Sequence, residues 1–260
     1  MYLAVPVRSC AGKALRGRSR PSLSFPSRAS KRHITSCNKR YAAASAVTVE
    51  SGSASGFDHV DASRSPPLRR SLSAEQRKFL ESALRVNHAG ELAAVLIYAA
   101  QKPPILKAYP HLKDLMQHMY DQEAGHLKTF NELLAKHRIR PTIMYPVWKL
   151  AATALGWSTA VMGREAAMAC TEAVETEIGE HYNNQVRELL KWEKDLEARG
   201  EPVSDEMREL LQTLRRIRDE ELEHLDHAVE NDAKQAKPYE LLTNVIRGGC
   251  RTAIWISERI

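Results

Sequence analysis

The sequence predicts an all-α protein whose core is a bundle of long helices. Three observations predict this class. Beyond residue 72, apolar residues recur at the three- and four-residue spacing of amphipathic helices. No segment alternates apolar and polar residues for long enough to indicate a β-strand. Capping residues, prolines and glycines divide the chain into segments whose lengths suit a helical bundle.

Residues 1–49 differ from the rest of the chain, because they carry ten Arg or Lys residues and no Asp or Glu. Segments that are rich in Arg and Ser and lack acidic residues are typical of mitochondrial or plastid presequences. We therefore expect a presequence, with a disordered basic tail as the alternative. Without these residues the chain has 28 basic residues against 32 acidic ones, so its net charge changes from +6 to −4. The folded part gives no support to nucleic-acid binding.

Residues 50–71 are rich in Ser, Gly and Pro, which predicts a flexible linker. The folded domain is expected at residues 72–260. Its first helix should begin after Ser73, because SAEQ has the form of a capping box. It should end near Gln101, because the sequence KPP follows and an interior proline disrupts a helix.

The remaining segments predict further helices over about 110–137, 158–197 and 204–232, the last with a serine as its N-cap. Residues 238–260 form a C-terminal helical segment in which two adjacent glycines predict a kink. The predicted architecture is therefore a four-helix bundle with additional helices.

One seven-residue motif, Asp-x-Glu-x-x-His-Leu, occurs twice, as DQEAGHL at 121–127 and as DEELEHL at 219–225. Side chains three residues apart in a helix lie on the same face. In both copies this face also carries apolar residues, so the Glu and the His are expected to point into the core. An unpaired carboxylate would be unfavourable there by several kcal/mol unless it bound a proton, a hydrogen-bond donor or a cation.

The same count of helical offsets selects one carboxylate where several are available. Glu221 lies on the apolar face of its helix, whereas Glu220 and Glu223 share faces with polar residues. The first and third helices each contribute a glutamate on an apolar face, and His88 and Glu172 are rivals ranked lower. The candidate metal ligands are Glu91, Glu123, His126, Glu175, Glu221 and His224.

Four glutamates and two histidines from four helices form the ligand set of ferritin-like di-iron or di-manganese bundles. Carboxylates neutralise two metal ions, imidazoles complete the coordination, and iron is favoured because it performs oxygen chemistry with such ligands. A surface ion pair is the alternative interpretation of a single Glu-x-x-His motif. Asp121 and Asp219 lie two residues before each glutamate, so they are expected to face away from the site, with support of the histidines as the alternative.

Five segments resemble the mitochondrial demethoxyubiquinone hydroxylases of ubiquinone biosynthesis, and the resemblance covers roughly residues 75–260. The segments are NHAGE at 87–91, DQEAGHLKTFNELL at 121–134, ACTEAVETEIGEHYNNQ at 169–185, RDEELEHLDHA at 218–228 and GCRTAIWISERI at 249–260.

This resemblance implies a carboxylate-bridged di-iron monooxygenase that uses O₂ to hydroxylate the ring of demethoxyubiquinone or its quinol in the penultimate step of the pathway. The implied iron ligands are the six residues chosen above. His181 and Tyr182 resemble residues beside the family's metal site, with ordinary packing as the alternative. NADH is the implied electron donor, although no dinucleotide-binding GxGxxG motif follows a strand.

The resemblance further implies a peripheral protein on the matrix side of the mitochondrial inner membrane, working with other ubiquinone-synthesis proteins that include a lipid-binding partner. Residues 141–163 contain a single charge, Lys149, and two tryptophans. The uncharged run within them is shorter than the roughly 20 residues that span a bilayer, so we expect interfacial insertion. The alternatives are a buried core helix and a docking face for a partner.

Three other functions fit parts of this pattern. A ferritin-like ferroxidase would keep the ligands but lack a pocket for a quinone. A peroxide-reducing di-iron protein usually carries a CxxC pair for electrons, and this chain has none. A non-enzymatic helical partner in a quinone-synthesis complex would use its carboxylates only in ion pairs.

Overall fold

The computed structural model describes Leu68 and residues 72–260. The predicted presequence at 1–49 and most of the linker at 50–71 lie outside this part of the chain. The described residues form six α-helices and two short 3₁₀ helices and contain no strand, so the all-α prediction is confirmed. The elements are α2 (Ala74–Ala108), η1 (Pro110–Leu112), α3 (Lys113–His137), α4 (Tyr145–Met162), α5 (Arg164–Ala198), α6 (Asp205–Glu230), η2 (Ala233–Gln235) and α7 (Tyr239–Ser257).

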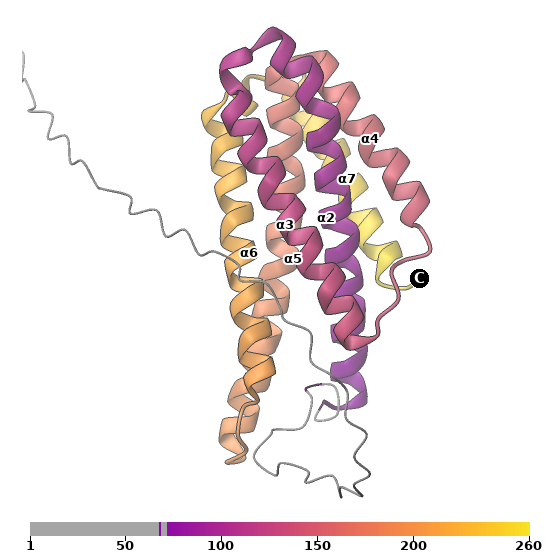
Figure 1. Cartoon of the computed structure of the whole chain (residues 1–260), viewed down its shortest axis with the longest axis vertical. Helices are drawn as coiled ribbons and strands as arrows, with labels where there is room; N and C mark the ends of the chain where they lie inside the picture. Colours follow the sequence, from indigo (N-terminus) through magenta and orange to yellow (C-terminus); the bar gives the residue numbers. More distant parts are fainter. Residues whose placement is uncertain (1–67, 69–71) are drawn as a thin grey trace, which may run out of the picture. The chain divides into compact units, whose positions relative to one another are not determined.

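Helices α2, α3, α5 and α6 are long and lie side by side as a bundle, and α4 and α7 pack against α2 and α5 (Figure 1). The four bundle helices bury large side chains along the axis, including Leu84, Phe130, Leu189 and Ile217. This arrangement agrees with the predicted ferritin-like bundle with additional helices.

Helix α2 begins at the predicted capping box but does not end at the predicted place. The Ser73 hydroxyl accepts the backbone N–H of Gln76, whose side chain accepts the backbone N–H of Ser73. The helix then continues through Pro103 and Pro104. Each interior proline disfavours a helix by about 3 kcal/mol, but the next turn buries Ile105 in the core. Packing therefore overrides the local signal that predicted an end near residue 101.

The predicted third helix, 158–197, is wrong at its beginning. Residues 158–162 belong to α4, and α5 starts only at Arg164. Gly163 separates the two helices with φ of +124°, a conformation that L side chains rarely adopt. The apolar pattern continues across this residue, so hydrophobic periodicity alone did not reveal the break.

The last two helices agree with the predicted segments. The Ser204 hydroxyl accepts the backbone N–H of Met207 and caps α6 as expected. Helix α7 continues without interruption through Gly248 and Gly249, where a kink was predicted. A glycine weakens a helix by about 1 kcal/mol relative to alanine but does not by itself bend it.

Helix α4, which contains most of the apolar segment 141–163, is not the buried core helix considered as an alternative. It buries only small or short side chains, and Leu150 on its outer face is 74% exposed. Among the described residues, no helix combines the length and apolar character needed to cross a bilayer. The outer face of α4 and α7 exposes Val147, Leu150, Trp157, Val161, Met162, Leu241, Val245 and Trp255.

Candidate metal centre

The structure brings all six sequence-predicted residues into one buried cluster between α2, α3, α5 and α6. These residues form two sets of four, and within each set one possible ligand atom from each residue lies within 4.8 Å of the other three. The sets share Glu123 and Glu221, which therefore stand between two possible metal positions. The first set, here called the His126 position, is Glu91, Glu123, His126 and Glu221, and the second, the His224 position, is Glu123, Glu175, Glu221 and His224.

The two histidines turn the same ring nitrogen toward the carboxylates. His126 Nδ1 lies 3.1 Å from Glu221 Oε1, and His224 Nδ1 lies 2.9 Å from Glu123 Oε1. The residues are nearly inaccessible to solvent, with side-chain exposures of 2% or less. The i to i+3 spacing of each Glu-x-x-His pair produces this geometry, because it places both side chains on the core face of one helix.

The buried carboxylates strongly affect each other's protonation. Burial, followed by the charge of Glu221, raises the pKa of Glu91, and the same causes raise the pKa of Glu175 well above its usual value. Burial lowers the pKa of His224, but the neighbouring carboxylates of Glu123 and Glu221 outweigh burial and raise it to about 9. These raised carboxyl pKa values show that unpaired negative charge is unfavourable in the cluster and that bound protons or cations would stabilise it.

The donor atoms fit a pair of metal ions. Several buried atoms of the cluster have no hydrogen-bond partner. They are both carboxylate oxygens of Glu123 and of Glu221, Oε2 of Glu91, and Nδ1 of His126 and of His224. Buried polar atoms without partners are uncommon in folded proteins and call for an explanation such as an ion. A set of carboxylates with two imidazoles suits iron or manganese better than softer metals.

Two buried tyrosines donate hydrogen bonds to Glu91 and Glu175, the glutamates that belong to only one ligand set each. The Tyr98 hydroxyl of α2 donates to Glu175 Oε1 at 3.0 Å. The Tyr182 hydroxyl of α5 donates to Glu91 Oε1. Tyr182 was among the residues expected beside the site. Tyr98 was not among the residues expected there, although its position on the same helix face as Glu91 was a signal that the sequence offered.

The outward nitrogen of each histidine also has a partner, and the sequence did not identify either one. His126 Nε2 lies 2.6 Å from Glu220 Oε2, and His224 Nε2 lies 2.9 Å from Gln122 Oε1. Glu220 had been assigned to a polar face, which is correct for its helix but overlooks the facing helix α3. Both partners occupy the same place in the repeated motif, directly before the glutamate.

The lower-ranked candidates lie outside the cluster. His88 Nε2 is 3.2 Å from Asn131 Oδ1, and Glu172 contacts Lys234 and the Tyr239 hydroxyl.

The two aspartates of the repeated motif do not contact the histidines. Asp121 accepts from Gln117, and Asp219 accepts from Arg218. His181, the second residue expected beside the site, forms no hydrogen bond or ion pair with any of the six candidate ligands in the described part of the chain. Burial instead lowers the pKa of its ring to about 4, so the ring is neutral near pH 7.

The cluster lies within the part of the chain that matches a known family. The model of the family described as ubiquinone biosynthesis protein COQ7 matches residues 78–257, which include all six cluster residues. The chain belongs to the COQ7 family.

Relatives of this COQ7-family chain come from eukaryotes and bacteria. The 5-demethoxyubiquinone hydroxylase, mitochondrial, of Saccharomyces cerevisiae is 45% identical over 205 residues, which cover 78% of this chain and 87% of the relative. The NADPH-dependent 3-demethoxyubiquinone 3-hydroxylase, mitochondrial, of Homo sapiens is 42% identical, with coverages of 75% and 93%. The 3-demethoxyubiquinol 3-hydroxylase of Rhodospirillum rubrum is 39% identical, with coverages of 70% and 78%.

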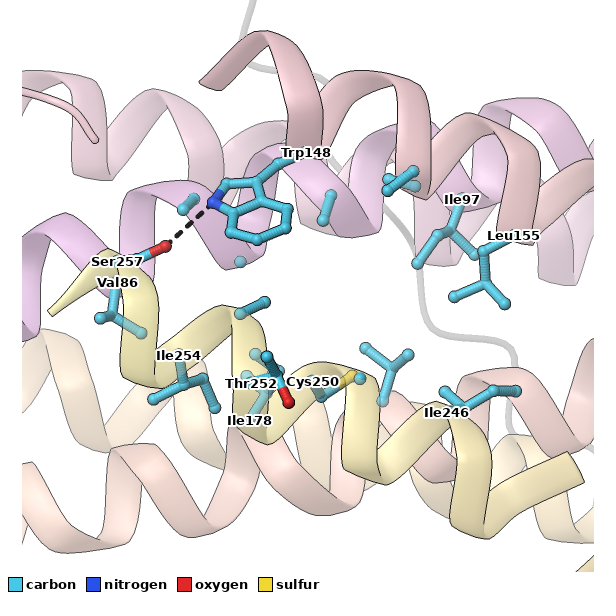
Figure 2. A pocket seen from close by; sticks show the side chains of 18 of the residues that line it. Val86, Ile97, Trp148, Leu155, Ile178, Ile246, Cys250, Thr252, Ile254 and Ser257 are labelled. Carbon is cyan, nitrogen blue, oxygen red and sulfur yellow. Dashed lines mark hydrogen bonds between the residues drawn. The ribbon is translucent and has the colours of Figure 1, made fainter. Parts of the chain in front are cut away.

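The COQ7-family chain also contains an apolar cavity of about 520 Å³ between α2, α4, α5 and α7 (Figure 2). Its size is typical of small-molecule sites. Trp148 Nε1 of α4 donates to Ser257 Oγ of α7 at 3.0 Å, which joins the two helices at one end of the cavity. Gly90 and Val174 line the wall, and each directly precedes a carboxylate of the cluster. The cavity therefore borders the two helices that carry Glu91 and Glu175.

Proposed function

We propose that the chain is an O₂-dependent di-iron monooxygenase that hydroxylates the ring of demethoxyubiquinone or its quinol in ubiquinone biosynthesis. The observation that carries this proposal is the pair of overlapping ligand sets that share Glu123 and Glu221. The relatives named above, all demethoxyubiquinone or demethoxyubiquinol hydroxylases, support the same reaction.

In this proposal, Glu91, Glu123, His126, Glu175, Glu221 and His224 hold two iron ions. Bound iron would supply the activation of O₂ that carbon hydroxylation needs. The residues of the chain provide the surroundings: Tyr98 and Tyr182 orient the two unshared carboxylates, and the apolar side chains of the bundle exclude bulk water.

The apolar cavity supports a quinone substrate with an isoprenoid tail. Its lining side chains are almost entirely apolar, and it opens beside the exposed face of α4 and α7. An isoprenoid chain gains roughly 25 cal/mol for each Å² of apolar surface removed from water. A cavity beside the ligand-bearing helices therefore fits a substrate whose ring must approach the metals while its tail stays in an apolar environment.

The exposed apolar face supports peripheral attachment to the mitochondrial inner membrane. Aromatic and aliphatic side chains on one side of a helix bind at the headgroup boundary of a bilayer. Replacing Leu150 and Trp157 together by Glu should reduce co-sedimentation with vesicles of phosphatidylcholine and cardiolipin. Replacing the exposed Leu222 of α6 by Glu is the control and should leave vesicle binding unchanged. Equal loss in both variants would contradict the assignment of this face.

The location of the protein and its partners stay predictions. The mitochondrial names of the eukaryotic relatives support the presequence at residues 1–49, while the linker and the folded domain at 72–260 follow from composition. Matrix-side orientation and a lipid-binding partner from the same pathway remain part of the proposal. Cross-linking in isolated mitochondria, followed by purification of the chain with whatever is attached to it, would identify such a partner.

A reduced nicotinamide nucleotide is the proposed source of electrons. The resemblance implied NADH, whereas the names of several relatives specify NADPH. Parallel anaerobic reductions of the iron-loaded protein with each nucleotide, in the presence of a short-chain quinone, would distinguish the donors by their rates.

Metal analysis and isotope labelling together test the proposed reaction. After anaerobic Fe²⁺ loading, we expect two iron ions per chain. Under ¹⁸O₂, the reduced protein should introduce one labelled oxygen atom into the substrate ring. Glu175→Ala should abolish both results, and Glu180→Ala, which removes an exposed carboxylate from the same helix, should abolish neither.

The same experiment separates the alternative functions. A ferroxidase would bind and oxidise iron without labelling the quinone, and a non-enzymatic helical partner would bind less than one iron ion per chain. Either result would overturn the proposed hydroxylase.

A further inference from the structure

The cluster has an internal two-fold pattern that relates α2 to α5 and α3 to α6. Each tyrosine that supports a carboxylate lies seven residues after the lone glutamate of its own helix. Each histidine lies three residues after a shared glutamate and turns Nδ1 inward. The outward Nε2 atom of each histidine contacts the residue directly before the shared glutamate of the facing helix.

This pattern is broken at one position. The residue before the glutamate is neutral in α3, where it is Gln122, and acidic in α6, where it is Glu220. Glu220 Oε2 lies 2.6 Å from His126 Nε2, and Gln122 Oε1 lies 2.9 Å from His224 Nε2. The shorter contact is the charged one, as expected for a charge-assisted hydrogen bond.

The negative charge of Glu220 is held in place by a third residue. Arg216, one helical turn before Glu220, donates Nη1 to both carboxylate oxygens at 2.8 and 3.0 Å. This pairing fixes the orientation of the Glu220 carboxylate toward α3. Among the described residues, no arginine or lysine forms a hydrogen bond with Gln122, whose amide oxygen contacts His224.

We propose that Glu220 makes the two metal positions unequal, so that the His126 position binds its metal ion more tightly than the His224 position. A carboxylate that accepts Nε2–H increases the electron density that Nδ1 offers to a metal, whereas an amide oxygen does so less. Glu220 is thus a positioning residue that acts through His126. This inference rests on the proposed metal centre and goes beyond it by ranking its two positions.

Anaerobic titration with Co²⁺, followed by absorption of the bound ion, tests the ranking. The unmodified protein should bind two ions with separate affinities. Glu220→Gln keeps an oxygen that accepts from Nε2, so only the charge is lost. We expect this variant to lower the Co²⁺ affinity of the tighter position by about 10-fold or more. The affinity of the weaker position should change by less than about 2-fold. An equal loss of Co²⁺ affinity at both positions, or no loss at either, would overturn the proposal.

The reverse substitution gives an independent test if Glu220→Gln fails to fold. Gln122→Glu should tighten the weaker position and bring the two affinities together. Asp219→Asn is the matched control, because it removes the same charge one residue earlier and the Asp219 carboxylate, among the described residues, accepts hydrogen bonds only from Arg218. An effect of Asp219→Asn as large as that of Glu220→Gln would show a general charge effect and overturn the proposal.

A spectroscopic readout separates the roles of the two positions. In ⁵⁷Fe-loaded protein, Mössbauer spectra should resolve two iron environments, of which Glu220→Gln shifts one and Gln122→Glu shifts the other. Failure of the unmodified protein to bind two ions would contradict the metal centre itself. Two bound ions with equal affinities and identical spectra would leave the centre intact and overturn only the inequality.

Discussion

Tyr98 of α2 and Glu175 of α5 form a buried hydrogen bond of 3.0 Å across the bundle, between residues 77 positions apart in the sequence. Tyr182 and Glu91 form the same contact in the opposite direction between the same helices. Each bond ties one side of the carboxylate cluster to the neighbouring helix. The hydroxyl groups therefore contribute to the shape of the site as well as to the stability of the bundle.

Tyr98→Phe should destabilise the metal-free protein, because it leaves Glu175 without its hydroxyl donor. Loss of one partner of a buried hydrogen bond typically costs about 1–3 kcal/mol. Urea unfolding of the metal-free protein measures this difference. Tyr120→Phe is the control, because Tyr120 is only partly buried and its ring lies beside Lys102; its effect should stay below about 0.5 kcal/mol. Equal destabilisation by both variants would contradict the role assigned to Tyr98.

The six candidate ligands were accessible from the sequence because their signal lies within single helices. Glu123 and His126 share a face by helical geometry alone, and so do Glu221 and His224. The apolar neighbours on those faces then indicated the core. No knowledge of how the helices contact each other was needed.

The partners of the histidines were not accessible in the same way. Whether Glu220 reaches His126 depends on the distance and relative rotation of α3 and α6, which no pattern within α6 reports.

The missed helix boundaries have a similar cause. Packing of Ile105 carries α2 past two prolines, and a single backbone angle at Gly163 separates α4 from α5.

His181 should make the protein sensitive to acid. Burial lowers the pKa of its ring to about 4, whereas an unfolded histidine titrates near 6.5. Because protonation then favours the unfolded chain, the stability from this residue is present above pH 6.5 and is lost as the pH falls toward 4. Each pKa unit corresponds to about 1.4 kcal/mol, so the loss should reach about 2–3 kcal/mol.

Comparison of variants isolates this effect from the titration of the carboxylates. His181→Asn cannot be protonated, so the difference in unfolding free energy between it and the unmodified protein should shrink between pH 7.5 and pH 4.5. His118→Asn removes an exposed histidine. The difference in unfolding free energy between this variant and the unmodified protein should stay constant over the same pH range. A constant difference for His181→Asn as well would show that the ring is not held neutral by burial.

Gly156→Ala should displace α4 from α2. A Cβ atom at this position would lie 2.8 Å from Ile97 Cα, and real Cβ atoms do not approach backbone so closely. Because the obstacle is backbone, overpacking should destabilise the protein by about 1–3 kcal/mol. Gly248→Ala is the matched control in α7, where nothing lies within 4 Å, and it should be neutral or stabilising by up to about 1 kcal/mol. Thermal unfolding of both variants measures the contrast, and equal melting temperatures would contradict the close approach of α4.

Ala253→Phe should impair substrate binding without affecting the metal centre. Ala253 lies in α7 and lines the apolar cavity, whereas all six candidate ligands lie in α2, α3, α5 and α6. The larger ring occupies space that the proposal assigns to the quinone, so KM should rise about 10-fold or more, which corresponds to roughly 1.4 kcal/mol of lost binding. Iron content should remain that of the unmodified protein.

Ala135→Phe adds the same volume at an exposed position of α3 and should change neither KM nor iron content. An unchanged KM for Ala253→Phe would show that the quinone binds elsewhere, and a loss of iron would show that the cavity wall and the metal centre are structurally coupled.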